Sequence, residues 1–314
     1  MRALVISRPG GPSVLELGDR PQPSPGPGQV VIRAAAATVN PTDLLLRLRG
    51  IGELPPPWTP GMEVAGTVEA VGVGADFHVG ERVFAIVNPR RPEGGAQAEF
   101  VVVSAASTAR TPDEISDAQA ATLPMNGLTA LQALRRLDLP SGATLGVIGS
   151  AGAVGQYAIQ LGVQAGLRVF ADAKPADEEL VRSLGANQVI ARSGDPGTAF
   201  RASAPDGVDG LIDAAVVDAA ALAPIRDHGS LATVRGWDGP TERGIRIEPI
   251  WVSADFERSN GLSALADMVR SGSLIPRIAD TYPVERASEA YARLEAGGVR
   301  GRLVLTFGGQ EPEM

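Results

Sequence analysis

The nine residues 147–155, with the sequence VIGSAGAVG, decide the fold of this chain. An apolar run over Thr144–Ile148 leads directly into three glycines spaced by three, and apolar residues then recur at helical spacing over 152–165. A strand, a glycine turn and a helix in this order let the backbone approach a pyrophosphate while helix N–H groups point at it. A tight turn that binds nothing is the competing interpretation, which the strand–turn–helix context disfavours. The pattern therefore predicts a dinucleotide-binding turn, formed by Gly149, Ser150, Gly152, Ala153, Val154 and Gly155.

The alternation of strand and helix continues after this turn. Further strands are expected at 167–171, 188–190, 210–213 and 230–234, with helices over 176–184 and 216–226 between them. His228 is expected at the end of the last of these helices, before Gly229 as its cap. Strands that alternate with helices form a parallel, doubly wound sheet, which places this half of the chain in the α/β class.

The first 120 residues have a different character. Short β-like runs at 4–7, 29–37, 66–71, 82–87 and 98–103 are separated by Pro- and Gly-rich turns, which is typical of a small, irregular β-barrel. Near the end of the chain, a helix is expected over 262–270. Residues 278–307 then return to a strand–helix–strand pattern.

Composition narrows the range of functions. The formal net charge of -8 argues against nucleic-acid binding, which requires a basic surface. The chain has no cysteine and only two histidines, so it has neither disulfides nor thiolate metal sites. No apolar run approaches the roughly 20 residues that span a bilayer, and the N-terminus lacks the apolar core of a signal peptide. These features predict a cytoplasmic protein with no membrane partner.

The end of the second strand bears on the choice of cofactor. Lys174 lies 19 positions after Gly155, near the position where an acid would bind the ribose diol of NAD. Asp172 lies 17 positions after Gly155 and has the opposite preference. Because side chains alternate along a strand, Asp172 and Lys174 share a face and could simply form a surface ion pair.

A series of motifs spans almost the whole chain. In order, they are VNPTD (39–43), PGMEVAGTVEAVGVG (60–74), VGERV (79–83), NGLTALQAL (126–134), GSAGAVG (149–155) and RGRLVL (300–305). Together they resemble the zinc-free quinone oxidoreductase and zeta-crystallin branch of the medium-chain dehydrogenase/reductase superfamily. The resemblance implies a GroES-like β-barrel catalytic domain built from 1–122 and 275–314, with a Rossmann domain inserted at 123–274.

The resemblance also implies roles for individual residues. Thr129 would lie near the nicotinamide, and Asn40 would face the nicotinamide or substrate, although an Asn before Pro41 is also a common turn residue. Lys174 and Arg192 fall near positions that hold the 2′-phosphate of NADPH in relatives. Met62 stands where zinc-dependent members have a histidine, so no zinc is expected, and Glu63 is expected to form an ion pair. Family members commonly form homodimers through an edge strand, here expected at 244–252.

These features favour an NADPH-dependent oxidoreductase that transfers hydride to a quinone or α,β-unsaturated carbonyl without zinc. Asn40 would offer a hydrogen bond to the acceptor, and water would supply the final proton. The chain lacks the tyrosine that often follows the Asn-Pro motif, and Gln97 replaces a common aromatic residue. An enoyl-thioester reductase and a non-catalytic NADPH-binding structural or sensor protein therefore stay open as alternatives.

Overall fold

The structure of the protein is a computed structural model that describes residues 1–52 and 54–308. It contains two compact units, one formed by Met1–Met125 with the chain from Ser253 onward, and one formed by Asn126–Val252. The sequence-based boundary assigned 253–274 to the Rossmann domain. In the structure, this segment belongs to the first unit because its helix α7 (Ser259–Arg270) packs against β7 (Thr108–Arg110).

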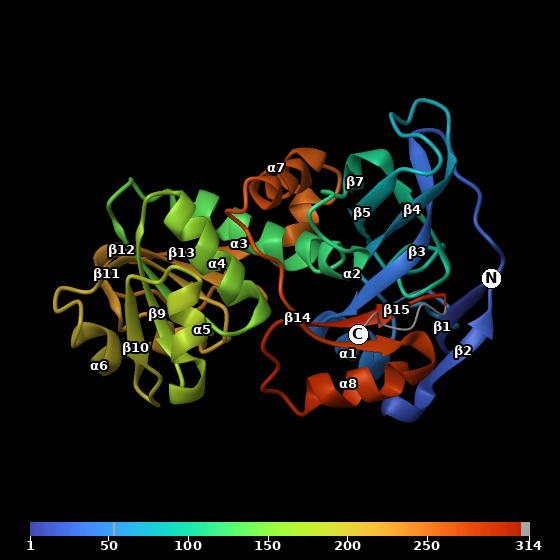
Figure 1. Ribbon diagram of the computed structural model, residues 1–314. Coiled ribbons are helices and arrows are strands. Elements are labelled where there is room, and N and C mark those ends of the chain that lie inside the picture. Colours follow the sequence, from blue (N-terminus) through green and yellow to red (C-terminus); the bar gives the residue numbers. More distant parts are fainter. Residues whose placement is uncertain (53, 309–314) are drawn as a thin grey trace. The chain divides into compact units, whose positions relative to one another are not determined.

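The second unit contains a six-stranded parallel sheet in the order β10-β9-β8-β11-β12-β13 (Figure 1). Its strands are β8 (Thr144–Ile148), β9 (Arg168–Ala173), β10 (Gln188–Ala191), β11 (Val208–Asp213), β12 (Ile225–Val234) and β13 (Arg246–Ile250). Its helices are α4 (Ala153–Gln164), α5 (Glu178–Ser183) and α6 (Pro196–Arg201). The strand order reverses direction between β8 and β11, and ligands of doubly wound sheets bind at such a switch point. The predicted parallel, doubly wound sheet is confirmed.

Helix α4 follows the glycine turn and packs on β8 and β9. Its inward residues include Tyr157, Ala158 and Leu161, all 3% exposed or less. Gly162 also faces the sheet, where a Cβ would lie 2.7 Å from Leu145 Cδ2. This small residue lets the helix axis approach the strand closely, which fixes the position of the helix N-terminus relative to the end of β8.

The helix predicted over 216–226 is wrong. Only a short 3-10 turn, Asp218–Ala221, forms there, and β12 already begins at Ile225. Val216 and Asp218 have positive φ angles, and Pro224 would fall in the last turns of the predicted helix, where its missing N–H breaks the hydrogen-bond pattern. His228, predicted at the end of that helix, instead lies within β12 with a φ of 59°.

The first unit contains a seven-stranded sheet in the order β14-β15-β3-β4-β5-β7, with β6 paired to β3, and a separate pair β1-β2 (Figure 1). The remaining strands are β1 (Arg2–Ile6), β2 (Leu15–Asp19), β3 (Gln29–Val39), β4 (Glu63–Val71), β5 (Arg82–Ile86), β6 (Phe100–Ser104), β14 (Ile278–Pro283) and β15 (Arg302–Thr306). Besides α7, the helices are α1 (Pro41–Arg49), α2 (Asp117–Ala120), α3 (Leu123–Leu137), most of which belongs to the second unit, and α8 (Ala287–Glu295). Strand β15, from the end of the chain, pairs antiparallel with β3, which joins the two ends of the sequence in one sheet.

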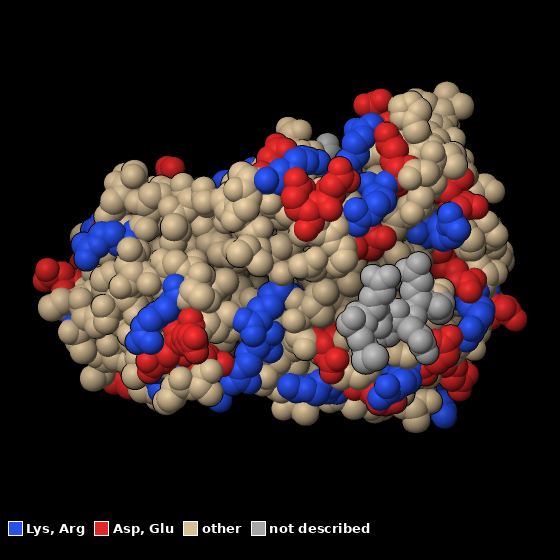
Figure 2. Space-filling model, viewed as in Figure 1, with Lys and Arg blue, Asp and Glu red and all other residues tan. Residues whose placement is uncertain are grey.

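The first unit has a continuous apolar core. Valine, alanine and leucine side chains of β3, β4, β5 and β15 meet Tyr291 of α8, which is fully buried. None of the described helices is long and apolar enough to cross a membrane. On the face shown in Figure 2, acidic and basic side chains are interspersed, which agrees with the modest net charge of -8.

Candidate active site

The glycine turn of the second unit connects β8 to α4. Gly149 has a φ of 84°, a conformation that favours glycine, and a Cβ there would lie 2.9 Å from Ala214 C of the neighbouring chain segment. A Cβ on Gly155 would lie 2.3 Å from Gly149 O. Gly152 is the N-cap of α4 and has no side chain to occupy the first N–H groups of the helix. The helix N-terminus is thus left able to bind an anionic group.

Asp172, at the end of β9, supports the same turn from behind. Its Oδ1 accepts hydrogen bonds from the N–H groups of Gly149 (2.8 Å) and Ser150 (3.1 Å) and from Ser150 Oγ (3.2 Å). Arg192 donates through Nε to Oδ2 (2.7 Å) and through Nη2 to Oδ1 (3.0 Å). Asp172 is 5% exposed, so both of its oxygens are committed inside the protein. The acid that the sequence offered as a ribose ligand therefore holds the glycine turn.

Asp172 pairs with Arg192 and not with Lys174, the partner that the shared strand face left possible. Asp172 and Arg192 come from adjacent strands. Ile190 of β10 is in register with Asp172 of β9, and Arg192 follows directly after β10. Lys174 is exposed, and no ion pair joins it to another residue in the described part of the chain. Of the two cations expected at a 2′-phosphate, Lys174 has no ion pair with a described residue, whereas Arg192 is already paired with Asp172.

A cavity of about 190 Å³ opens beside these residues. It is lined by Ile148, Asp172, Ala191, Arg192, Ser193, Pro196, Ala199, Phe200, Ala215 and Val217. The lining combines apolar side chains with the Asp172–Arg192 pair, which suits a flat heterocycle attached to a polar sugar. The cavity lies at the carboxyl ends of β8, β9 and β10, where the fold is expected to bind its nucleotide.

Asp213 is a polar residue of this unit that the sequence analysis did not identify. It ends β11, in register with Ile148 of β8, and accepts N–H groups of Ala215, Val217 and Asp218 at 2.8–3.1 Å. Burial raises the pKa of its carboxyl group, which those hydrogen bonds partly oppose. Asp213 therefore shapes the loop beside the glycine turn, and no motif in the sequence singled it out.

In the first unit, Asn40 joins β3 to α1 and is 2% exposed. Its main-chain N–H donates to Asp43 Oδ2 (2.8 Å), and Gly61 N donates to Asp43 Oδ1 (2.9 Å). Burial raises the pKa of Asp43 to about 7, although both backbone hydrogen bonds and the nearby Arg302 act in the other direction. Asp43 therefore fastens the start of α1 to the segment that precedes β4.

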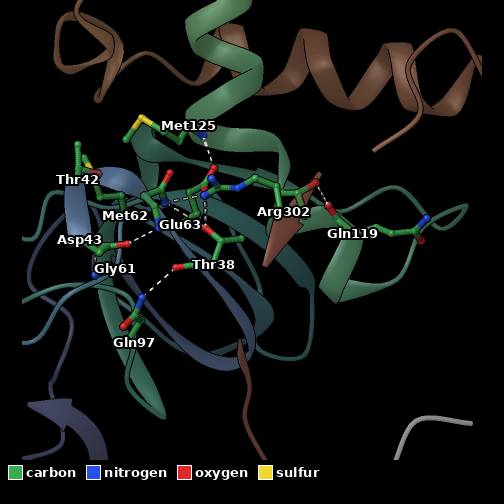
Figure 3. A network of polar contacts seen from close by, with 12 residues as sticks. Thr38, Thr42, Asp43, Gly61, Met62, Glu63, Gln97, Gln119, Met125 and Arg302 are labelled. Carbon is green, nitrogen blue, oxygen red and sulfur yellow. Dashed lines mark hydrogen bonds and ion pairs between the residues drawn. The ribbon is translucent and has the colours of Figure 1, made fainter. Parts of the chain in front are cut away.

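Glu63 is the centre of a buried polar network (Figure 3). Its Oε2 accepts from Arg302 Nη2 (2.7 Å), from Asn40 Nδ2 (3.1 Å) and, in a short contact, from Thr38 Oγ1. Its Oε1 accepts from Met125 N (2.6 Å). Glu63 and Thr38 are 0% exposed and Arg302 is 4% exposed. The ion pair expected for Glu63 is present, and its partner comes from the last strand of the sheet.

Zinc does not fit the residues beside Glu63. Met62 precedes Glu63, and its Sδ accepts a hydrogen bond from Thr42 Oγ1 at 2.9 Å. Zinc in proteins is held by thiolate, imidazole and carboxylate groups, and a thioether is a poor substitute. Among the described residues, no three His, Asp or Glu side chains form a group that could hold a metal ion.

Thr129, the other residue expected at the nicotinamide, lies in α3 and is 8% exposed. The structure thus brings together the predicted cofactor residues of the glycine turn and, through Asp172, Arg192. Lys174 follows β9 and is exposed. Thr38, Asp43 and Arg302 were not assigned a role from the sequence, although the VNPTD motif contains Asp43 and the RGRLVL motif contains Arg302. Thr38 and Arg302 meet Glu63 from positions 25 and 239 residues away, which no local pattern predicts.

Two family models match the chain, the alcohol dehydrogenase GroES-like domain over residues 26–113 and the zinc-binding dehydrogenase model over 184–305. The chain is 32% identical to an NADPH-dependent alkenal/one oxidoreductase of Arabidopsis thaliana, over 97% of this chain and 79% of that protein. It is 28% identical to a chloroplast envelope quinone oxidoreductase homolog of the same plant, over 94% and 95% of the two chains.

The structure is similar to that of a mycobacterial protein complexed with NADPH, with a TM-score of 0.85, 30% identity and 98% and 100% of the two chains covered. The predicted combination of a GroES-like domain and a Rossmann sheet is confirmed. The chain belongs to the medium-chain dehydrogenase/reductase superfamily and is an oxidoreductase related to the quinone and alkenal/one oxidoreductases.

Proposed function

We propose that this protein transfers hydride from NADPH to a quinone or an α,β-unsaturated carbonyl without the help of zinc. One observation carries the proposal: the nucleotide turn keeps its glycines and its free helix N-terminus, while a hydrogen-bonded network lies beside Met62 where zinc-dependent members have a metal ligand. The names of the relatives support the two acceptor classes.

The chemistry of these acceptors fits this arrangement. When bound, the reduced nicotinamide supplies a hydride from its C4 atom. A quinone or enone delocalises the developing negative charge onto its own oxygen, so that no Lewis acid is needed to polarise it. The protein has to align the acceptor, exclude water and hold polar groups in fixed positions. Water is the proposed source of the final proton.

The residues proposed to hold the cofactor lie in the second unit. Gly149, Ser150, Gly152, Ala153, Val154 and Gly155 form the proposed pyrophosphate cradle. The N–H groups of Ala153, Val154 and Gly155, in the first turn of α4, are the proposed donors to the pyrophosphate. Those of Gly149 and Ser150 donate to Asp172, and that of Gly152 donates to Gly149 O, so these residues shape the turn. Lys174 is the proposed direct partner of the 2′-phosphate, because it is exposed and carries no ion pair with any described residue. Arg192 is 32% exposed and keeps donors beyond the two that bind Asp172, so it can approach the same phosphate.

Asn40 and Thr129 are the proposed polar groups at the reacting atoms. Replacing either with alanine should lower catalytic efficiency about 10- to 100-fold, which corresponds to the loss of one hydrogen bond to a reacting group. The folded fraction of each variant, measured by thermal unfolding, serves as the control. Full activity in both variants would remove these residues from the reaction.

Oxidation of NADPH, followed by its absorbance, tests the proposed function directly. The purified protein is assayed with a benzoquinone, a short-chain enone, an enoyl-CoA and a saturated ketone, each with and without a metal chelator. We expect turnover with the quinone or the enone, unchanged by the chelator, and none with the saturated ketone. Turnover of the enoyl-CoA alone would identify an enoyl-thioester reductase, and no turnover with any acceptor would support the non-catalytic alternative.

A further inference from the structure

The hydrogen-bond network around Glu63 determines which way the side-chain amide of Asn40 faces. Asn40 Nδ2 lies 3.1 Å from Glu63 Oε2 and 3.2 Å from Thr38 Oγ1. The amide nitrogen has two hydrogens and therefore donates one to each of these oxygens. Neither hydrogen of Asn40 is left for a ligand.

The two atoms that Asn40 Nδ2 contacts can act only as hydrogen-bond acceptors toward it. Thr38 Oγ1 donates its one hydrogen to Glu63 Oε2 and accepts from Arg302 Nη2 at 2.9 Å, so it meets Asn40 with a lone pair. Glu63 Oε2 is a carboxylate oxygen and can only accept while the group is ionised. Arg302, 2.7 Å away and buried with it, supplies the balancing positive charge.

Turning the amide over would be costly. It would place Asn40 Oδ1 against a carboxylate oxygen and a hydroxyl lone pair, two contacts between acceptors in a buried site. An amide orientation is often a matter of assignment, but here the fixed acceptors leave one choice. The carbonyl oxygen then faces away from Glu63 and Thr38. It takes part in the capping box of α1 with the N–H of Asp43 and, with two lone pairs, can accept one further hydrogen bond.

We propose that Glu63, anchored by Arg302, is a positioning residue that holds Asn40 as a hydrogen-bond acceptor in the active site. The ligand group that meets Asn40 is then an N–H or O–H donor, such as the carboxamide of a nicotinamide or the hydroxyl of a reduced product. This inference rests on the proposed function for its kinetic consequences, and it reverses the donor role that the sequence suggested for Asn40. The orientation itself does not depend on any substrate.

Side-chain amide NMR tests the orientation without any assay of turnover. The chain contains only five asparagines, Asn40, Asn88, Asn126, Asn187 and Asn260, so selective ¹⁵N labelling gives a short list of signals, and the variant Asn40→Asp assigns the one of interest. We expect both Asn40 amide protons to exchange slowly with solvent in the wild type and to lose that protection in Glu63→Gln. Rapid exchange in the folded wild type would overturn the proposal, as would protection that is unchanged in Glu63→Gln.

Exchanging the amide and the carboxylate between positions 40 and 63, which conserves the net charge, tests the acceptor role of Asn40. Asn40→Asp alone places two carboxylates side by side, and we expect it to lower catalytic efficiency about 100-fold or more. The double variant Asn40→Asp/Glu63→Gln restores one carboxylate and one amide beside Arg302, with an acceptor oxygen still at position 40. It should therefore recover about 10-fold or more of the loss, a coupling typical of residues in direct contact.

The swap separates the two possible roles of Asn40. If the reaction requires a donor at position 40, the double variant stays as inactive as Asn40→Asp, because aspartate has no N–H, and the proposal is overturned. Thermal unfolding of the three variants shows whether they fold. If Asn40→Asp does not, the Asn40 amide is assigned in the wild type from its through-bond connection to the Asn40 backbone, and the NMR measurement still decides the orientation. If the wild type turns over no acceptor, the proposed function fails, while the orientation of Asn40 is still decided by NMR.

Discussion

Lys174 and Arg192, two cations near the end of β9, differ in whether their side chains are already bound to a carboxylate. Lys174 is exposed, whereas Arg192 holds Asp172 through two hydrogen bonds of 2.7 and 3.0 Å. A charge-assisted hydrogen bond to phosphate contributes about 1.5–3 kcal/mol, and NADH offers no phosphate to either residue. The preference for NADPH is therefore expected to depend first on Lys174.

Substitution of each cation tests that preference. Lys174→Ala should lower catalytic efficiency with NADPH about 10- to 100-fold and leave NADH nearly unaffected. Arg192→Ala should lower both, because Asp172 then loses the partner that neutralises it beneath the glycine turn. Arg182→Ala, which removes an exposed arginine of α5, is the matched control. A wild type that prefers NADH would show that Asp172 turns to the ribose and sets the choice.

Asp43 predicts a particular dependence of stability on pH. Its pKa of about 7 in the folded protein lies above the ordinary value of 3.8, so the folded state holds this proton where the unfolded state has released it. Between these two values, the Asp43 contribution to the unfolding free energy therefore falls as pH rises, by up to about 1.4 kcal/mol per pH unit. Below the lower value and above the higher one, the contribution is constant.

Denaturant unfolding between pH 4.5 and 7, in the wild type and in Asp43→Asn, checks this dependence. The difference between the two proteins isolates Asp43 from other titrating groups, because asparagine cannot ionise. The wild type should lose stability relative to the variant as pH rises through this window. Parallel curves for the two proteins would mean that Asp43 is ionised throughout.

At the scale of elements, the turn between β8 and α4 depends on glycines that leave no room for a Cβ. A methyl group on Gly155 would lie 2.3 Å from Gly149 O and 2.7 Å from Ser150 Cα. Gly155→Ala should therefore displace the N-terminus of α4 and lower affinity for NADPH about 10-fold or more, since several N–H groups move together.

Binding of NADPH, measured by calorimetry, checks the Gly155→Ala prediction. The control is Gly194→Ala in the same unit, where a Cβ would meet nothing within 4 Å and the backbone has no positive φ. Equal affinities in the wild type and in Gly155→Ala would show that the turn does not position the cofactor.

The elements differ in how far the sequence alone could predict them. The parallel sheet, the glycine turn and the strand–helix–strand ending follow from local periodicity and glycine spacing, which are properties of short segments. The helix over 216–226 fails because Asp213, at the end of β11, takes up the N–H groups of Val217 and Asp218 in a different conformation. The pair of Glu63 and Arg302 joins residues 239 positions apart, so it depends on β15 reaching β3 and no local pattern contains it.

At the scale of the whole molecule, β13 lies at the edge of the six-stranded sheet and is expected to pair with a second copy of the chain. An edge strand presents unpaired backbone groups, and Trp251, at its end, is 58% exposed. Pro249 has no N–H, so pairing is expected on either side of it. We expect a homodimer at micromolar concentration.

Light scattering of the wild type and of Trp251→Glu checks the predicted dimer. The variant should dissociate, because it places a charge in the expected interface, whereas Val73→Glu, at an 85% exposed position of the first unit, should not. A wild type that is monomeric at these concentrations would reject the interface.

In the proposed reaction, hydride passes directly from NADPH to a carbon atom of the acceptor without a metal. The most direct measurement uses NADPH carrying deuterium at both C4 positions, chelator-treated protein and an enone, followed by NMR of the product. We expect one deuterium on the β-carbon of the saturated product and a solvent proton on the α-carbon. A product without deuterium at the β-carbon, or activity that appears only when zinc is added, would contradict it.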